Sequence, residues 1–209
     1  VGDICNNALT IPHKQKSKIH YYNFIETSGL PPSVAETRFQ RSLSFYNEYK
    51  KHFLNNSIVP HAPYSVSPEL FAMIDSFASK TLTIHNQETS AEDVLYQSGQ
   101  GDLIRLYENF NINYSSFAPL GKSSLQTYLA YFTHQQPVIL VHNTFTAEDD
   151  IRFAKAHAAD VFFCLCINAN LYIEQALPPV ELLRKEQCHI VVGTDSLASN
   201  WQLSVLSEL

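Results

Sequence analysis

The sequence predicts an α/β fold in which crossover helices cover a parallel sheet, and three observations support this. Short apolar runs that favour strands alternate with longer stretches of helical periodicity. Hydrophobic residues make up 45% of the chain and charged residues 16%, which is typical of a protein with a buried core. The six glycines form neither a GxGxxG nor a Walker pattern, which favours a barrel over a nucleotide-binding doubly wound sheet.

The predicted strands and helices follow each other along the chain. Seven strands are expected, at residues 1–5, 18–26, 57–64, 82–88, 137–143, 160–166 and 189–195. Six helices are expected, at residues 33–53, 67–80, 90–110, 123–134, 146–158 and 178–187, with Gly99 and Gly101 as weak points of the third. Ser67, Ser90 and Thr146 are the predicted N-caps, because a hydroxyl and first-turn acids satisfy free N–H groups and complement the helix dipole.

Charge and composition exclude several classes of partner. The net charge is -6, so no phosphate-tracking basic face is expected and nucleic acid is excluded as a partner. No apolar run approaches the roughly 18 to 20 residues of a membrane span, and the N-terminus lacks the order of a signal peptide. The four cysteines lack the spacing of a zinc or disulfide framework and are expected to be reduced. The sequence therefore predicts a soluble, cytoplasmic protein.

Polar residues stand at the ends of four predicted strands. His61, His85, His142 and Asp195 each close a different apolar run. The carboxyl ends of parallel strands meet at one edge of a sheet, where sites form. A single histidine there is more often a hydrogen-bonded structural residue, but four polar residues on separate strands favour a site.

The residue types at this edge suit a metal-dependent reaction. Imidazole nitrogen and carboxylate oxygen are ligands of zinc and similar ions, and His85 and Asp195 are the predicted ligands. Glu88 follows His85 by three residues, which suits a proton shuttle; the alternative is a helix cap. His142 is expected to bind the attacking water or a developing oxyanion, and the alternative is a hydrogen bond to a backbone carbonyl.

Five segments resemble one known family in their order along the chain. They are HAPYSVSPEL from His61, IHNQET from Ile84, LVHNTF from Leu140, CINANLYI from Cys166 and VVGTDSLASN from Val191. Together they resemble the amidohydrolase superfamily, within it the branch of cytosine deaminase-like enzymes, chlorohydrolases and adenosine-derivative deaminases. The resemblance covers nearly the whole chain. Each segment alone is weak, and the five in order are a strong signal.

This resemblance implies a (β/α)8 TIM-type barrel with strands two to eight present, residues 1–209 forming one barrel domain. It implies that His85 and Asp195 hold one divalent metal, zinc or iron, and that Asp195 takes a proton from the attacking water. It assigns Glu88 as the proton shuttle to a ring nitrogen of the substrate. His142 would orient the water and stabilise the tetrahedral intermediate.

The resemblance also implies further contacts and shows two departures. His61 and Asn170 would contact the substrate, with Asn170 in a loop after the seventh strand; Ser199 and Asn200 follow the eighth. Ile167 stands where the family usually has proline. None of the nine histidines forms the family's His-x-His pair, so the chain looks like a segment truncated at both ends. We therefore expect weak or absent metal binding and no activity in this chain alone, and self-association through open sheet edges.

The leading hypothesis is hydrolytic deamination of an amino-substituted heterocycle or nucleoside derivative, a small-molecule substrate. One alternative is a chlorohydrolase acting on triazine-like compounds, with the same groups. Another is a non-catalytic barrel relative that serves binding or assembly, which a His-x-His pair upstream of Val1 would argue against. A serine hydrolase would need a Gly-x-Ser-x-Gly elbow, which the chain lacks. Substrate choice is expected to depend on loops such as residues 111–122.

Overall fold

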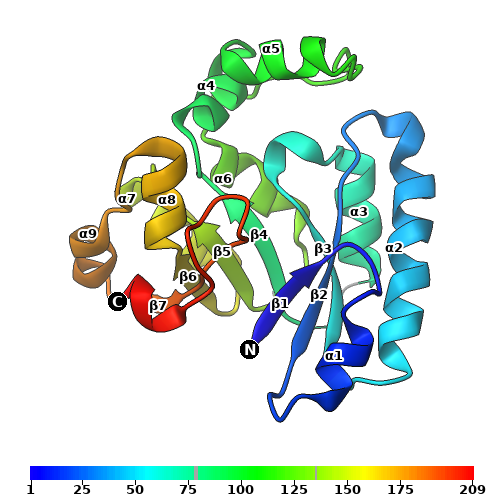
Figure 1. Ribbon diagram of the computed structural model, residues 1–209. Helices are drawn as coiled ribbons and strands as arrows, with labels where there is room; N and C mark the ends of the chain where they lie inside the picture. The colour runs from blue at the N-terminus through cyan, green and yellow to red at the C-terminus, as the bar shows by residue number, and fades with distance from the viewer. Residues whose placement is uncertain (78–79, 135) are drawn as a thin grey trace.

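Seven parallel strands form the centre of the molecule. The computed structural model describes residues 1–77, 80–134 and 136–209. All seven predicted strands are present. They form two sheets, and in each sheet the strands are ordered as they are along the chain (Figure 1). They are β1 (Gly2–Cys5), β2 (Tyr22–Thr27), β3 (Asn56–Pro60), β4 (Leu82–Asn86), β5 (Val138–His142), β6 (Val161–Leu165) and β7 (His189–Val192).

The strand order identifies an incomplete barrel. The orders β1-β2-β3 and β4-β5-β6-β7 are sequential, and every pair is parallel. The N–H of His85 donates to the carbonyl of His61 over 2.9 Å, which links the ends of β3 and β4. A doubly wound sheet would reverse its strand order at a switch point. In the described part of the chain no ladder joins β1 to β7, so the barrel is open, as predicted.

Nine α-helices and four short 3₁₀ turns accompany the strands in the described residues. The α-helices are α1 (Ile11–Lys16), α2 (Ala35–Lys50), α3 (Pro68–Phe77), α4 (Ser90–Ser98), α5 (Asp102–Asn109), α6 (Ser124–Tyr128), α7 (Glu148–His157), α8 (Ile167–Glu174) and α9 (Val180–Lys185). The 3₁₀ turns are η1 (Pro32–Val34), η2 (Pro63–Ser65), η3 (Leu129–Tyr131) and η4 (Val205–Glu208). Figure 1 shows α4 and α5 projecting beyond the strands at the top of the view. The predicted helix 67–80 includes residues 78–79, which lie outside the described residues.

Two of the three predicted N-caps are wrong. Ser67 caps α3 as predicted, since its hydroxyl accepts from the N–H of Leu70. Helix α4 is capped by Thr89 instead of Ser90, and α7 begins after Ala147. The hydroxyl of Thr146 donates instead to the side-chain carbonyl of Gln87 over 2.8 Å, so tertiary contact overrides the local capping preference.

Two helices were not predicted, and one replaces an expected loop. Helix α1 is short, and α8 begins at Ile167, immediately after Cys166. Asn170 therefore lies on a helix and not in a loop. The predicted break at Gly99 and Gly101 is confirmed, because both have positive φ angles, 70° and 98°, and separate α4 from α5.

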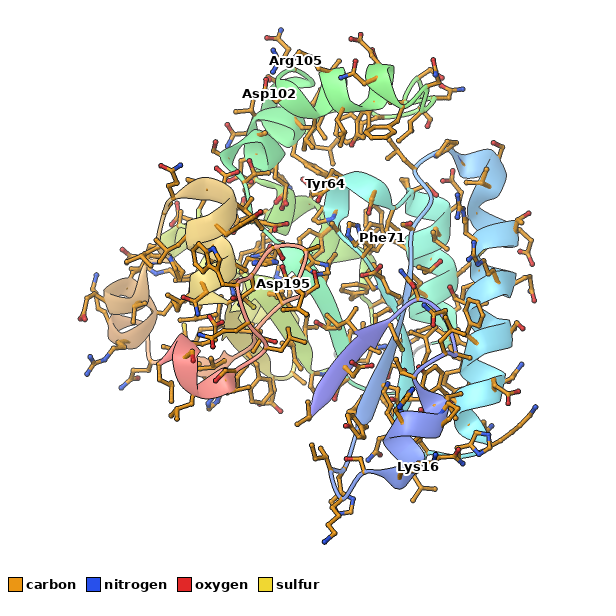
Figure 2. All side chains as sticks on the ribbon, in the orientation of Figure 1. Lys16, Tyr64, Phe71, Asp102, Arg105 and Asp195 are labelled. Atoms are coloured by element: carbon orange, nitrogen blue, oxygen red, sulfur yellow. The ribbon has the colours of Figure 1, made fainter. Side chains whose placement is uncertain are left out.

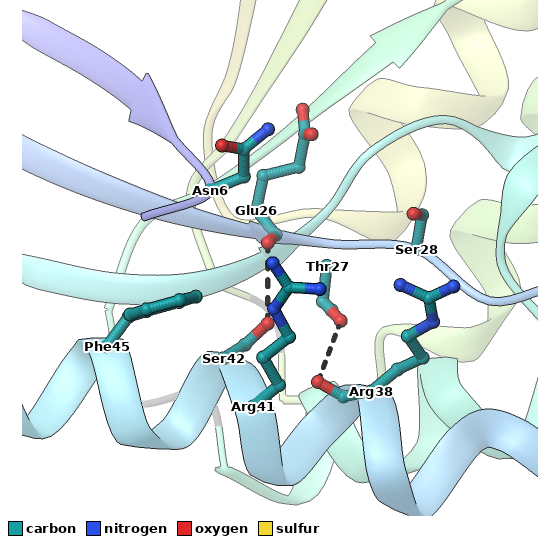
Figure 3. A pocket seen from close by; sticks show the side chains of 8 residues that line it. All are labelled: Asn6, Glu26, Thr27, Ser28, Arg38, Arg41, Ser42 and Phe45. Atoms are coloured by element: carbon teal, nitrogen blue, oxygen red, sulfur yellow. Dashed lines mark hydrogen bonds between the residues drawn. The ribbon is translucent and has the colours of Figure 1, made fainter. Parts of the chain in front are cut away.

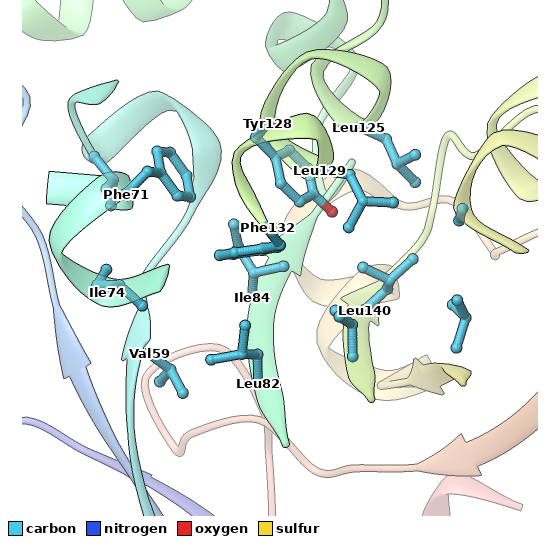
Figure 4. Close-up of a cluster of buried hydrophobic side chains, with 14 of the residues drawn as sticks. Val59, Phe71, Ile74, Leu82, Ile84, Leu125, Tyr128, Leu129, Phe132 and Leu140 are labelled. Atoms are coloured by element: carbon cyan, nitrogen blue, oxygen red, sulfur yellow. The ribbon is translucent and has the colours of Figure 1, made fainter. Parts of the chain in front are cut away.

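The main hydrophobic core lies between the strands and the surrounding helices (Figure 4). Leu82 and Ile84 of β4 alternate along the strand and pack there with Phe71, Tyr128 and Leu140, all 1% exposed or less. Because successive strand residues point to opposite faces, His85 faces away from this core. Packing of the apolar face thus determines the direction of the polar one.

The cysteines and the helices were also the subject of predictions, on disulfide bonds and on membrane spans. All four cysteines are free, as predicted. Gly193 on the segment after β7 allows a close approach, because a Cβ there would lie 2.9 Å from the sulfur of Cys164. Within the described residues, no helix combines the length and the apolar character needed to cross a membrane.

Candidate active site

The structure brings the predicted strand-end residues together. The ring centroids of His61 and His85 are 5.0 Å apart, and those of His85 and His142 are 5.4 Å apart. Asp195 follows β7 and lies near the centre of the molecule in Figure 2, far from Asp102 and Arg105 on α5. Strands distant in sequence therefore contribute to one cluster.

Left-handed backbone at three strand ends directs these side chains. His142 has φ of 76°, Asp195 has 54°, and Gln87, just before Glu88, has 44°. In β5, Leu140 packs in the main core, so regular alternation would direct His142 toward that core as well. The left-handed turn instead lets its ring stack on His85. Such conformations are costly for non-glycine residues and persist where surrounding contacts stabilise them.

Three residues form a potential metal-binding group. One ligand atom from each of His85, His142 and Asp195 lies within 4.8 Å of the others. Nδ1 of His85 lies 2.8 Å from the backbone carbonyl of His61 and donates to it, which leaves Nε2 as the ligand atom. Two imidazoles and one carboxylate suit a divalent ion such as zinc. The structure thus groups His142 with the two predicted ligands.

The side chain of Asn170 determines the tautomer of His142. Its Nδ2 donates to the backbone carbonyl of His142 over 3.2 Å, so its Oδ1 faces Nδ1 of the ring at 2.9 Å. Nδ1 must therefore carry the proton, and Nε2 has a free lone pair. Nε2 is buried without a hydrogen-bond partner among the described residues. Asn170 itself is fully buried and bonds to His142; the substrate contact predicted for it stays a prediction.

Glu88 lies next to this free nitrogen. Its Oε1 is 3.5 Å from Nε2 of His142. Burial raises the pKa of Glu88, an effect that His85 partly offsets and Asp195 reinforces. Burial lowers the pKa of His142, which favours the neutral ring. Burial thus favours the protonated carboxyl of Glu88 and the neutral imidazole of His142, an arrangement suited to proton transfer.

Sequence reasoning missed Glu26 on β2. Its Oε2 is 4.0 Å from Nδ1 of His85, and Glu26, His61 and His85 form a second potential metal-binding group. Burial raises the pKa of Glu26 and lowers that of His61 to about 4. Nδ1 of His61 is also 2.8 Å from the hydroxyl of Ser65. A charged residue within the apolar stretch 22–27 was the available signal, since buried strands seldom carry one without a partner.

The residues after Asp195 support the turn. The hydroxyl of Ser199 donates to Oδ2 of Asp195. Nδ2 of Asn200 donates to the carbonyl of Thr194 over 2.7 Å and to Glu208 over 2.8 Å. Both residues therefore hold the segment that carries Asp195.

A separate cavity of about 180 Å³ lies between β2 and α2 (Figure 3). Arg38 and Arg41 of α2 line it, and the hydroxyl of Thr27 donates to the carbonyl of Arg38. Glu26 also lines this cavity, but its carboxylate approaches His85. The cavity thus adjoins the candidate site on the helix side of β2.

We predict that Asn170→Leu lowers both stability and activity. The change leaves Nδ1–H of His142 buried without an acceptor, which costs about 1 to 3 kcal/mol in the free energy of unfolding. Urea denaturation measures this loss. Asn168→Leu is a suitable control, since Asn168 lies on the same helix and bonds to Glu208 and Ser207 instead of the histidine. Equal activity in the Asn170→Leu variant and the unchanged protein would contradict the prediction.

The sequence of this chain is similar to one protein family and to deaminases of two bacteria. The model of the family described as "Amidohydrolase family" matches residues 22–209. An adenosine deaminase of Helicobacter pylori is 25% identical and covers 100% of this chain and 51% of its own. A 5-methylthioadenosine/S-adenosylhomocysteine deaminase of Aquifex aeolicus is 28% identical over 85% of this chain and 38% of its own.

One solved structure supports the fold. Aminofutalosine deaminase of Helicobacter pylori superimposes with a TM-score of 0.87 at 23% identity, over 98% of this chain and 52% of that one. The chain therefore spans about half the length of the first relatives it matches.

Proposed function

Because the chain belongs to the amidohydrolase family, we propose that the protein hydrolytically deaminates an amino-substituted heterocycle, such as a nucleoside derivative. The observation that carries this proposal is the approach of Glu88 to the free Nε2 of His142, at 3.5 Å, beside His85 and Asp195. The two sequence relatives are named as deaminases of adenosine-type compounds, which supports it.

The metal proposed for this site is zinc, with iron as the alternative. His85 and Asp195 would hold it, while Nε2 of His142 stays free for the water. The tautomer of His85, which leaves its Nε2 as the ligand atom, and the nearby carboxylate of Asp195 fit such an ion. A bound divalent ion supplies Lewis acidity and lowers the pKa of water.

The residues of this chain divide the proton transfers between them. Water adds to the ring carbon that carries the amino group, and Asp195 takes one proton from it. Protonated Glu88 donates to the adjacent ring nitrogen, while Nε2 of His142 accepts a hydrogen bond from the water. The protonated Asp195 then returns its proton to the amino group, which leaves as ammonia, while the hydroxyl on the tetrahedral carbon gives its proton to Glu88 and becomes a carbonyl. His61 would contact the heterocycle, and its low pKa keeps it neutral.

The test uses the complete protein as its gene encodes it. Bound metal is measured first, and ammonia release is then screened with aminopurines, aminopyrimidines, adenosine derivatives and aminotriazines. Ammonia release from one of these classes would establish the activity. Chloride release from a chlorotriazine alone would indicate a chlorohydrolase. Substrate binding without turnover would indicate a binding module.

We also propose a location, a domain organisation and an association state for the protein. We infer a cytoplasmic location, which the four free thiols support. We also infer that residues 1–209 belong to one barrel domain. Self-association remains a prediction based on the edges of β1 and β7, which lack a strand partner among the described residues.

A further inference from the structure

A buried carboxyl group, that of Glu92, lies next to the candidate site and bonds to Gln87 and Ser124 and not to the site's histidines. Glu92, in the first turn of α4, has no exposed surface. Its Oε1 accepts two hydrogen bonds, from the backbone N–H of Gln87 over 2.8 Å and from the hydroxyl of Ser124 over 2.5 Å. Its Oε2 has no hydrogen-bond partner among the described residues. Glu92 thus joins α4 and α6 to the residue that precedes Glu88.

Gln87 is held from several directions. Its backbone is left-handed, and its carbonyl accepts from the N–H of Phe145 over 3.2 Å. Its side-chain amide donates to Asp150 over 2.9 Å, and its side-chain carbonyl accepts from Thr146 over 2.8 Å. A residue so constrained determines the direction in which the next residue, Glu88, leaves the strand.

Two hydrogen bonds between Asn86 and Asn143 connect the turns that carry Glu88 and His142. The N–H of Asn143 donates to the carbonyl of Asn86 over 3.0 Å. Nδ2 of Asn86 donates to Oδ1 of Asn143, also over 3.0 Å. Because these residues flank Gln87 and His142, a shift of the Gln87 turn changes the distance between Glu88 and the histidine.

We propose that Glu92 is a positioning residue for Glu88, acting through the backbone N–H of Gln87. The proposal rests on the proposed function, in which Glu88 carries the proton. Glu92 touches neither the substrate nor the metal ligands. Its role is to hold the Gln87 turn so that Glu88 stays near Nε2 of His142.

The experiment compares two changes of Glu92 with one matched control. Glu92→Leu removes the acceptor of Gln87, and Glu92→Gln keeps an oxygen in its place. Asp75→Leu is the control, because Asp75 is also buried and its carboxylate accepts from the N–H of Thr133 over 3.0 Å and from its hydroxyl over 2.6 Å. Asp75 lies on α3, and in the described part of the chain its carboxylate contacts Thr133 and His134 and not His85, His142 or Asp195.

Glu92→Leu is expected to lower kcat about 10- to 100-fold while KM stays within about twofold, since the bound substrate loses only its aligned proton donor. Glu92→Gln is expected to keep kcat within about threefold of the unchanged protein. Asp75→Leu is expected to lower stability without lowering kcat. A folded Glu92→Leu variant with unchanged kcat would overturn the proposal, as would an equal loss in Asp75→Leu. If Glu92→Leu does not fold, Glu92→Asp, one methylene too short to reach Gln87, takes its place with the same criteria.

Hydrogen exchange separates this proposal from the proposed function. The Gln87 amide is expected to exchange faster in Glu92→Leu than in the unchanged protein, with or without deaminase activity. Unchanged exchange would overturn the positioning role. Absence of ammonia release from the unchanged protein, with faster Gln87 exchange in the variant, would instead count against the deaminase function and leave the contact itself supported.

The stability of the protein should also depend on Glu92 and pH. Burial raises the pKa of Glu92 from 4.5 to about 8, while Ser124 and Gln87 lower it and the charges of Asp93 and Glu88 raise it. The folded state therefore binds a proton that the unfolded state releases between about pH 4.5 and 8. The contribution of Glu92 to the free energy of unfolding falls as pH rises through this window. Urea midpoints measured from pH 5 to 8 should decline more steeply in the unchanged protein than in Glu92→Gln; equal slopes would contradict the prediction.

Discussion

Glu88→Gln is expected to lower the rate of deamination about 100- to 10,000-fold while the fold and the bound metal stay intact. Glutamine keeps the shape and most contacts of the side chain but cannot give a proton to the substrate ring. Positioned acid and base groups contribute about this much to catalysis. Ammonia release under saturating substrate measures the effect, and circular dichroism and metal analysis check the fold.

The control for Glu88→Gln is Glu181→Gln on α9. The Glu181 side chain is 90% exposed and lies outside the site, so this variant should retain full activity. A Glu88→Gln variant with more than about a tenth of the original kcat would remove Glu88 from the proton-transfer role. Such a result would favour Glu26 as the acid, because its buried carboxyl also approaches His85.

Asp195→Asn is expected to abolish stoichiometric metal binding and, with it, activity. The loss of a hydrogen-bond partner behind a ligand already weakens metal binding about 10- to 100-fold, so removal of a direct charged ligand should weaken it by at least about 100-fold. Metal content after dialysis against a weak chelator measures this directly. Activity should fall in proportion to the metal lost.

The matched control is Asp149→Asn, an exposed aspartate in the first turn of α7. It should retain metal and activity. Full metal content in Asp195→Asn would indicate that His85 binds the ion with another carboxylate, for which Glu26, grouped with His61 and His85, is a candidate. The double variant Glu26→Gln, Asp195→Asn would then lose the metal.

Local sequence pattern predicted the seven strands, because the period of apolar residues is a property of neighbouring positions, but it placed the ends of most of them up to four residues from the observed ones. The same reasoning gave two wrong caps at Ser90 and Thr146. The hydroxyl of Thr146 bonds instead to Gln87 from elsewhere in the chain. At α4 the cap is the neighbouring Thr89, whose hydroxyl accepts from the N–H of Ala91. The local pattern also missed α8, where a loop was expected at Asn170.

In the candidate site too, some features could be predicted from the local sequence and others depend on the fold. The amino-acid pattern alone shows which residue types stand near the strand ends: three histidines, Glu88 and Asp195. That Nε2 of His142 is the free nitrogen follows only from the fold, because it depends on the amide of Asn170, 28 residues away. The hydrogen bond from the N–H of Gln87 to Glu92 likewise appears only in the folded chain. Strand periodicity is set by adjacent residues, whereas tautomers, left-handed turns and buried hydrogen bonds are set by partners that folding brings together.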